Sequence, residues 1–159
     1  MNGIPILIRE ENSLFRIADI QSSATREIRP SGWSRIKSCL LKVVPELSVN
    51  LVQQKNFRRF AALLKERVPE PVVILAGAGH QGRAMTQLIR ELPSAQVVTT
   101  DIYVSPKTTL VADVHDLPFP DASCDGIVLQ AVLEHVVDPY RAVQEAARVL
   151  KSGGLIYAE

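Results

Sequence analysis

Glycines and acids stand at the ends of apolar segments in the second half of the chain, with a spacing typical of nucleotide sites. Three glycines spaced G-x-G-x-x-G, namely Gly77, Gly79 and Gly82, directly follow the apolar run Val72–Ala76. Glycine lets a backbone approach a ligand closely, and the free amides at the start of a following helix favour an anionic or polar group. The motif alone is weak evidence, because glycines also allow close strand–helix packing without a ligand.

Two aspartates strengthen the case for a ribose-containing ligand. Asp101 follows the β-branched run 96–100, and Asp113 follows the run 108–112. Asp101 lies 19 residues after Gly82 in the sequence. In dinucleotide-binding folds, an acid at about this sequence spacing accepts hydrogen bonds from the ribose hydroxyls. Each aspartate alone is more simply a cap or turn residue. Together, the glycine turn, Asp101 and Asp113 stand at the ends of three consecutive predicted strands, and they favour a ribose-containing cofactor.

The segments that would position these residues alternate between strand and helix patterns from residue 71 onward. Asp138 suits the N-cap of a helix, Pro139 its first position and Gly153 the left-handed position at its C-terminus. Such alternation predicts a parallel sheet whose ligand crevice lies at the carboxyl ends of the strands. The apolar runs predicted as strands are 72–76, 96–100, 108–112, 126–129 and 154–158, and the helical segments are 83–92 and 139–150.

Residues 1–70 are predicted to form a mainly helical N-terminal region, and residues 71–159 the α/β domain. Pro5 confines the extended start, 3–8, to a sheet edge, and Asn12 is the expected cap of a helix over 13–20. Residues 21–32 are expected to be a linker. Two amphipathic helices, 33–44 and 57–68, are expected to cover one end of the sheet.

Composition is that of an ordinary soluble globular protein. The chain has 159 residues, of which 47% are hydrophobic and 22% charged, enough for one domain with a core and a small appendage. No membrane span is expected, since no window reaches about 18 uninterrupted apolar residues. The start lacks the pattern of a secretory signal, and the isolated Cys39 and Cys124 suggest neither a disulfide nor a metal site, so a cytoplasmic location is expected.

The central segment 111–136 resembles the class I S-adenosylmethionine-dependent methyltransferases, in particular the subgroup of ubiquinone- and menaquinone-biosynthesis enzymes. That subgroup shows a similar D-x-x-x-L-P-F-x-D-x-S-F-D…L-E-H-V pattern, and 148–154 is similar to its R-V-L-K-P-G-G segment. The resemblance covers about residues 72–159. We therefore predict a Rossmann-like three-layer sandwich with a mainly parallel sheet of strand order 3-2-1-4-5. S-adenosylmethionine is the implied cofactor, and methyl transfer to an unidentified small molecule is the implied function.

The resemblance also implies roles for individual residues. Gly77 and Gly79 would pack against the methionyl part of the cofactor, and Asp101 would hold the ribose hydroxyls. Ile102 and Val114 would lie beside the adenine, Asp113 would meet its amino group, and Gln130 would lie near the methionyl tail. The implied cofactor-binding set is Ala76, Gly77, Gly79, Asp101, Ile102, Asp113, Val114 and Gln130.

The chain departs from the family pattern at several positions. Leu75 stands where the family usually has an acid two residues before its first glycine, and Gln81 stands where its third glycine is often found. The family normally continues past its fifth strand into two more, whereas this sequence stops at Glu159, so the domain is expected to be incomplete at its C-terminus. With nothing after it, the strand 154–158 would be an apolar edge. We predict that the N-terminal region or a second copy of the chain covers that edge.

No catalytic residue is assigned, because methyl transfer is an in-line displacement that depends mainly on positioning. His135, Glu134 and His80 are candidate general bases by location, and each is more simply structural or exposed. The family segment Asn/Asp-Pro-Pro-aromatic that accompanies methylation of nucleic-acid bases is replaced here by 130–133. A small-molecule acceptor and no nucleic-acid partner are therefore expected. The glycine spacing leaves a nicotinamide oxidoreductase fragment open as one alternative. The absence of the usual acid at Leu75 leaves a non-catalytic interaction module open as another.

Overall fold

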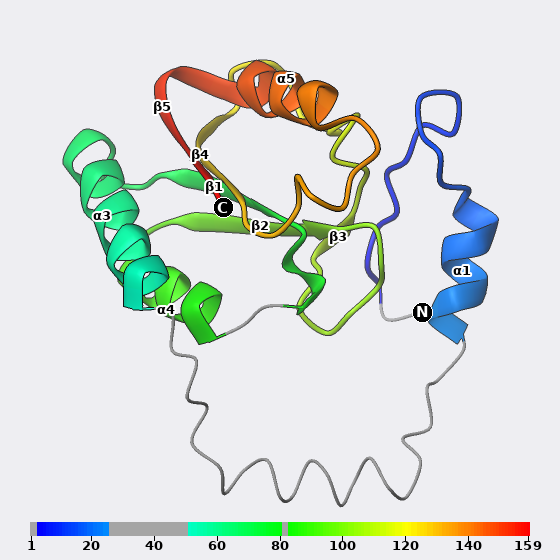
Figure 1. The fold of residues 1–159 in the computed structure, drawn as a ribbon, viewed down its shortest axis with the longest axis horizontal. Coiled ribbons are helices and arrows are strands. Elements are labelled where there is room, and N and C mark those ends of the chain that lie inside the picture. The colour runs from blue at the N-terminus through cyan, green and yellow to red at the C-terminus, as the bar shows by residue number, and fades with distance from the viewer. Residues whose placement is uncertain (1–2, 26–50, 81–82) are drawn as a thin grey trace, which may run out of the picture.

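The computed structural model describes residues 3–25, 51–80 and 83–159, and it contains one parallel sheet of five strands (Figure 1). The strand order is β3-β2-β1-β4-β5, which confirms the predicted order 3-2-1-4-5 and the Rossmann-like architecture. The strands are β1 (Val72–Ala76), β2 (Gln96–Asp101), β3 (Leu110–Val111), β4 (Cys124–Leu129) and β5 (Leu150–Ala158).

Helices cover both faces of the sheet, which makes three layers (Figure 1). On one face lies α5 (Pro139–Val149), and on the other lie α3 (Leu51–Arg67) and α4 (Arg83–Glu91). Side chains along β1 alternate between the two faces, because successive residues of a strand point in opposite directions. Val73 and Leu75 pack with α3 and α4, whereas Ile74 and Ala76 pack on the side of α5. The hydrophobic core therefore has two parts, one on each face of the sheet, as expected for a parallel sheet covered on both sides.

The sequence of each covering helix explains which face it buries. In α3, Phe57, Phe60, Ala61 and Leu64 recur at helical spacing and are all buried. In α5, Asp138 is the N-cap, and its side chain accepts a hydrogen bond from the Arg141 amide at 3.0 Å. Both helices were predicted, and the start of α5 at Pro139 is confirmed, but α3 begins six residues before the predicted 57–68.

The end of α5 differs from the prediction. The helix stops at Val149 and β5 begins at the next residue, so Gly153 does not terminate a helix. Gly153 keeps the predicted left-handed backbone, with φ at +77°, inside β5. The pairing of β5 with β4 shifts register between Cys124 and Gly126. Between these two pairings β5 has more residues than β4, and Gly153 lies within this irregular part of β5.

The N-terminal segment 3–8 lies along β3 at the edge of the sheet and pairs with it through a bridge between Ile6 and Val111, which confirms the predicted extended edge segment (Figure 1). The Leu7 amide donates to the Val111 carbonyl and the Val111 amide to the Pro5 carbonyl, both at 2.9 Å. The first helix, α1 (Ile17–Thr25), begins four residues later than predicted. Asn12 does not cap it, because the Asn12 amide group binds Asp116, and Glu10 accepts the hydrogen bond of the Ile17 amide at 2.7 Å.

Other boundaries also differ from the predictions. Residues 21–25, expected to be linker, belong to α1. β3 is shorter than predicted, spanning two residues. The predicted helix 33–44, Cys39 and residues 26–32 lie outside the described residues. The division at residue 70 stays a prediction, although α3, which precedes it, packs on the sheet.

At the other edge of the sheet, β5 packs against α3 through the ring of Tyr157. The ring centroids of Tyr157 and Phe57 are 4.7 Å apart, and those of Tyr157 and Phe60 are 6.3 Å apart. The N-terminal region therefore covers one face of β5. In the described part of the chain no strand pairs with its outer edge. Coverage of that edge by a second copy stays a prediction.

Cys124 illustrates how tightly the sheet is packed. Its side chain is fully buried between the sheet and α5, and its thiol lies 3.3 Å from the Val149 carbonyl. Burial, together with the nearby Asp125 carboxylate, raises the pKa of the thiol to about 11. A thiolate is the reactive form of cysteine, so this thiol should be inert in the folded protein.

We expect Cys124 in a Cys39→Ser variant to react with a thiol reagent at pH 8 at least about a hundredfold more slowly than in the unfolded chain. The rise in pKa from 9.0 to about 11 alone lowers the thiolate fraction by about that factor. Stopped-flow absorbance in buffer and in denaturant measures both rates. Equal rates under the two conditions would contradict the burial of this side chain.

Candidate functional site

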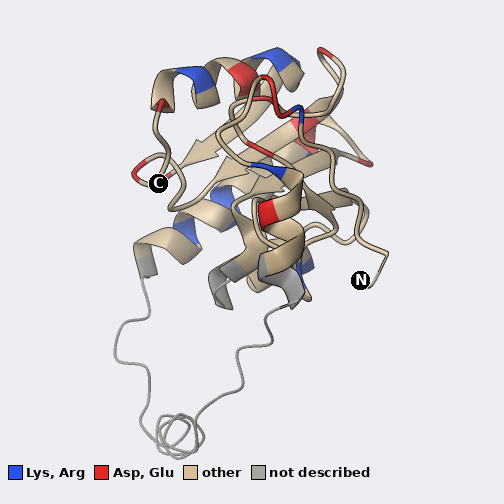
Figure 2. Cartoon of the chain, turned by 90° about the vertical axis from the view of Figure 1, so that its right-hand side faces the viewer, with Lys and Arg blue, Asp and Glu red and all other residues tan. Residues whose placement is uncertain are grey.

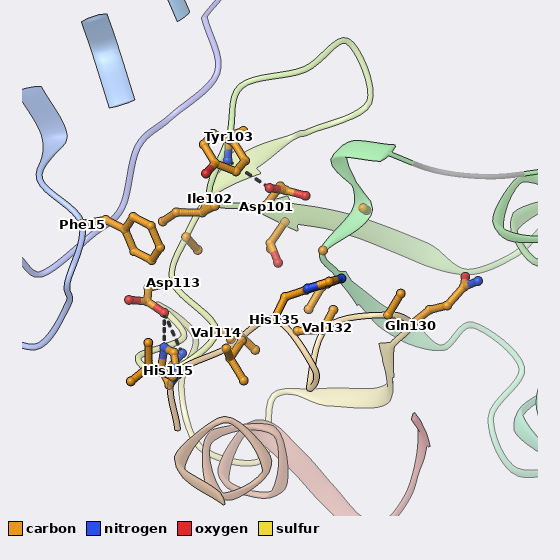
Figure 3. Close-up of a pocket in the computed structure, with 18 of the residues that line it drawn as sticks. Phe15, Asp101, Ile102, Tyr103, Asp113, Val114, His115, Gln130, Val132 and His135 are labelled. Atoms are coloured by element: carbon orange, nitrogen blue, oxygen red, sulfur yellow. Dashed lines mark hydrogen bonds and ion pairs between the residues drawn. The ribbon is translucent and has the colours of Figure 1, made fainter. Parts of the chain in front are cut away.

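A cavity of about 550 Å³ opens at the carboxyl ends of the strands (Figure 3). This is the edge at which parallel α/β sheets bind ligands, and the volume lies in the range of small-molecule pockets. Seven of the eight predicted cofactor-binding residues line the cavity, namely Ala76, Gly77, Asp101, Ile102, Asp113, Val114 and Gln130. The eighth, Gly79, lies in the short 3-10 helix η1 (Ala78–His80) just after β1. The fold therefore gathers the predicted residues, and their binding roles stay predictions.

The turn after β1 is held against β2 by Asp101. One carboxylate oxygen of Asp101 accepts a hydrogen bond from the Gly79 amide at 2.7 Å. The other accepts a hydrogen bond from the Tyr103 amide at 3.0 Å (Figure 3). A β-carbon added at Gly79 would lie 2.7 Å from the Asp101 carboxylate, so a side chain there would require that carboxylate to move. A carboxylate has about four lone-pair positions, so Asp101 can still accept hydrogen bonds from a ligand.

Gly77 meets the loop after β4. Its φ is +71°, and a β-carbon at this position would lie 2.5 Å from a methyl carbon of Val132. The loop residue Ala131 also has positive φ, at 51°, and its amide donates to the Glu159 carbonyl at 2.7 Å. The first two glycines of the motif are thus required by contacts within the chain itself. Those contacts leave the wall of the cavity at Gly77 formed by backbone.

Asp113 lies almost entirely buried at the far side of the cavity, 3% exposed. One carboxylate oxygen accepts hydrogen bonds from the amide and the ring nitrogen Nδ1 of His115, at 2.9 and 2.7 Å (Figure 3). The other oxygen accepts a hydrogen bond from the Ser13 hydroxyl. Asp113 therefore has partners inside the chain at both oxygens, and one lone-pair position remains for the adenine amino group that the resemblance assigned to it.

His115 is tied into this network by its second ring nitrogen. The Asp138 amide donates to Nε2 at 3.3 Å, so Nε2 acts as an acceptor and the proton lies on Nδ1, facing Asp113. His115, which lines the cavity, joins the segment after β3 to Asp138, the N-cap residue of α5.

The candidate general bases are placed differently from one another. His135 lines the cavity from the loop after β4 (Figure 3), whereas Glu134 is exposed and lies outside the lining. The side chain of His80 lies outside the described residues. Leu75, which replaces the family's usual acid, is buried between the sheet and the helices α3 and α4. No group of three metal-ligating side chains occurs in the described ranges.

The N-terminal segment contributes residues to the cavity that the sequence did not indicate. Leu14 and Phe15 line it, more than sixty residues before the glycine turn. Met85, Thr100, Tyr103, Val132, Val136 and Val137 complete most of the remaining wall. The result is a mainly apolar cavity with carboxylates at one side. Such a cavity suits a ligand that has an apolar ring system, hydroxyl groups and a polar tail.

Charged residues of both signs are distributed over the elements around the site. Figure 2 shows blue and red segments interspersed on α5, which carries Arg141, Glu145 and Arg148. Arg148 binds Glu145 at 2.8 Å and Asp121 at 2.7 Å. Within the described residues, no helix is both long and apolar enough to cross a membrane.

The sequence matches known methyltransferases. A family model described as "Methyltransferase domain" matches residues 75–158. The chain is 49% identical over 45 residues to the Mycobacterium tuberculosis protein named "Probable S-adenosylmethionine-dependent methyltransferase Rv3030", covering 28% of this chain and 16% of that protein. It is 32% identical over 93 residues to 2-methyl-6-phytyl-1,4-hydroquinone methyltransferase 2, chloroplastic, of Oryza sativa subsp. japonica, covering 58% of this chain and 23% of the relative.

Solved structures show the same fold. The YcgJ protein of Bacillus subtilis matches with a TM-score of 0.53 and 24% identity, over 67% of this chain and 49% of that chain. The chain thus spans about half of this solved structure and less than a quarter of the two relatives above. None of these matches favours a nicotinamide oxidoreductase.

Proposed function

The chain belongs to the methyltransferase domain family, and on that premise we propose that it binds S-adenosylmethionine and transfers a methyl group to a small-molecule acceptor. The observation that carries the proposal is the position of the cavity. It lies between the glycine turn after β1, Asp101 at the end of β2 and the loop after β4, all of which belong to the matched residues 75–158. Membership of the ubiquinone- and menaquinone-biosynthesis subgroup stays a prediction.

The residues present fit this cofactor. Asp101 is partly exposed to the cavity and retains lone pairs for ribose hydroxyls. Ile102 and Val114 provide apolar surface for the adenine, and Gly77 offers bare backbone near Gln130 for the methionyl end. When bound, S-adenosylmethionine supplies an electrophilic methyl group attached to a sulfonium.

The chain's own contribution is to position the reactants and exclude water. The apolar walls around Val132 and Val136 shield the centre of the cavity. Holding two reactants in line contributes much of the rate enhancement of such a transfer. A hydroxyl acceptor must also lose a proton, and we propose His135, which lines the cavity, as the group that accepts it.

The proposal extends to partners and location. A small-molecule acceptor, rather than nucleic acid, is supported by Gln130–Leu133 in place of the base-methylating segment. We propose a cytoplasmic location on the basis of composition, and a homodimer in which a second copy pairs with the outer edge of β5. The support for such pairing is that, among the described residues, no strand pairs with the outer edge of β5.

Ligand-induced stabilisation tests the cofactor directly. We expect S-adenosylhomocysteine at about 100 times its Kd to stabilise the folded chain by about 2.7 kcal/mol, because a ligand that binds only the native state shifts the unfolding equilibrium. NAD at the same concentration is the control and should leave Tm unchanged. Thermal unfolding followed by circular dichroism measures both.

Three outcomes separate the alternatives. Stabilisation by NAD alone would contradict the proposal and support a dinucleotide-binding fragment. Stabilisation by neither ligand would support an interaction module that does not bind this cofactor. Binding of S-adenosylhomocysteine without methyl transfer to any hydroxyl or amine acceptor in a screen would confirm the cofactor and contradict the transferase activity.

A further inference from the structure

The N-terminal segment is anchored to the carboxyl edge of β3 at several points. Besides the backbone hydrogen bonds to Val111, Arg9 binds the Asp116 carboxylate through two nitrogens, one at 2.7 Å. Asn12 donates to the same carboxylate at 3.3 Å. Burial by itself would raise the pKa of Asp116, but the hydrogen bonds from Arg9 and Asn12 outweigh it and lower the pKa. Asp116 is therefore an ionised anchor for this segment at neutral pH.

A second anchor leads into the cavity. The Ser13 hydroxyl donates to Asp113 and accepts a hydrogen bond from the Phe15 amide at 3.1 Å. Asp113 is itself fixed by the two hydrogen bonds from His115. Ser13 thus connects a rigid, buried carboxylate to the backbone of Phe15. This connection sets where the aromatic ring of Phe15 lies.

Phe15 faces the end of the cavity nearest β2 and β3. Figure 3 shows its ring beside Ile102 and Asp113, away from Gln130. Phe15 and Ile102 pack against the same small hydrophobic cluster around Val111, which keeps both side chains in place. The ring is partly exposed and lines the cavity. An apolar ring face is therefore presented to a ligand beside Ile102, the residue that follows Asp101.

We propose that Phe15 stacks on the adenine ring of the cofactor and that Ser13 is the positioning residue for it. This inference rests on the proposed function, because Asp101 then holds the ribose and the base extends from there towards Ile102 and Phe15. The methionyl end extends the other way, to Gly77 and Gln130. The N-terminal segment, outside the matched residues 75–158, accordingly forms part of the nucleoside site.

Two ligands and two variants test the inference in the intact chain. We expect Phe15→Ala to weaken S-adenosylhomocysteine and 5′-methylthioadenosine equally, by about 5- to 150-fold, since removing an aromatic platform costs about 1–3 kcal/mol per stacked base. The matched variant Gln130→Ala should weaken S-adenosylhomocysteine only, because 5′-methylthioadenosine lacks the amino-acid tail. Isothermal titration calorimetry measures all four affinities, and thermal unfolding checks that each variant is folded.

Conservative variants keep the test valid if Phe15→Ala does not fold. Phe15→Leu retains apolar volume in the cluster but not the ring, and it should still lose affinity for both ligands. Ser13→Ala should weaken both ligands as well, and Ser13→Thr, which keeps the hydroxyl, should restore them. Unchanged affinities in folded Phe15→Leu would overturn the inference while leaving the proposed function intact. Failure of the wild-type chain to bind either ligand would overturn the proposed function and this inference with it.

Discussion

Gly77→Ala is expected to lower the free energy of unfolding by about 2–5 kcal/mol. A side chain at positive φ costs about 1–2 kcal/mol, and forcing extra volume into a packed site costs about 1–3 kcal/mol more. Both apply here, because φ is +71° and the new β-carbon would lie 2.5 Å from a methyl carbon of Val132. Urea unfolding of the wild type and the variant measures the difference.

Gly153 offers a matched control for the backbone contribution. Its φ is +77°, and a β-carbon there would meet nothing within 4 Å. Gly153→Ala should therefore show the backbone cost alone, about 1–2 kcal/mol. Adding Val132→Ala to Gly77→Ala should recover part of the lost stability, which a double-mutant cycle detects as coupling. Equal losses in the two glycine variants, with no coupling to Val132, would contradict a steric role for that contact.

Asp101→Ala is expected to weaken S-adenosylhomocysteine binding by about 10- to 150-fold. Each hydrogen bond to a charged group is worth about 1.5–3 kcal/mol, and a buried partner left unsatisfied adds to the loss. The variant also removes the acceptor for the Gly79 amide, now 2.7 Å from the carboxylate, so the glycine turn loses its tie to β2. Calorimetric titration of both proteins measures the change in Kd.

Asp101→Asn separates charge from shape. The amide keeps an oxygen for the Gly79 or Tyr103 amide but loses the negative charge, so its Kd should lie between those of the wild type and Asp101→Ala. Thermal unfolding of both variants identifies any loss caused by misfolding. An unchanged Kd in a folded Asp101→Ala chain would remove this residue from the binding site.

The sheet could be predicted because its signals are local. Val72–Ala76 and 126–129 are short apolar runs beside turn residues, and both form buried strands. The start of α5 was predictable for the same reason, since Asp138 and Pro139 specify it within two positions. The seven predicted residues that meet in one cavity do so because parallel strands all end at the same edge.

The errors arise where distant contacts override local preference. Asn12 suits a helix cap, yet its side chain binds Asp116, 104 residues away, and the helix starts later. Gly153 suits a helix end, yet β4 pairs with Leu150 immediately after the helix and draws the chain into a strand. Phe15 was missed because its place in the cavity depends on the partner of Ser13, which no local pattern reveals.

The bond between Ser13 and Asp113 also has a consequence for the order of events during synthesis. The two residues are 100 positions apart, so at roughly 5–20 residues per second the ribosome makes the second roughly 5–20 s after the first. Throughout that interval the apolar side chains of Ile4, Ile6 and Ile8 have no β3 edge on which to pack. The nascent chain therefore exposes this apolar N-terminal segment until β3, which is synthesised later, is available to cover it.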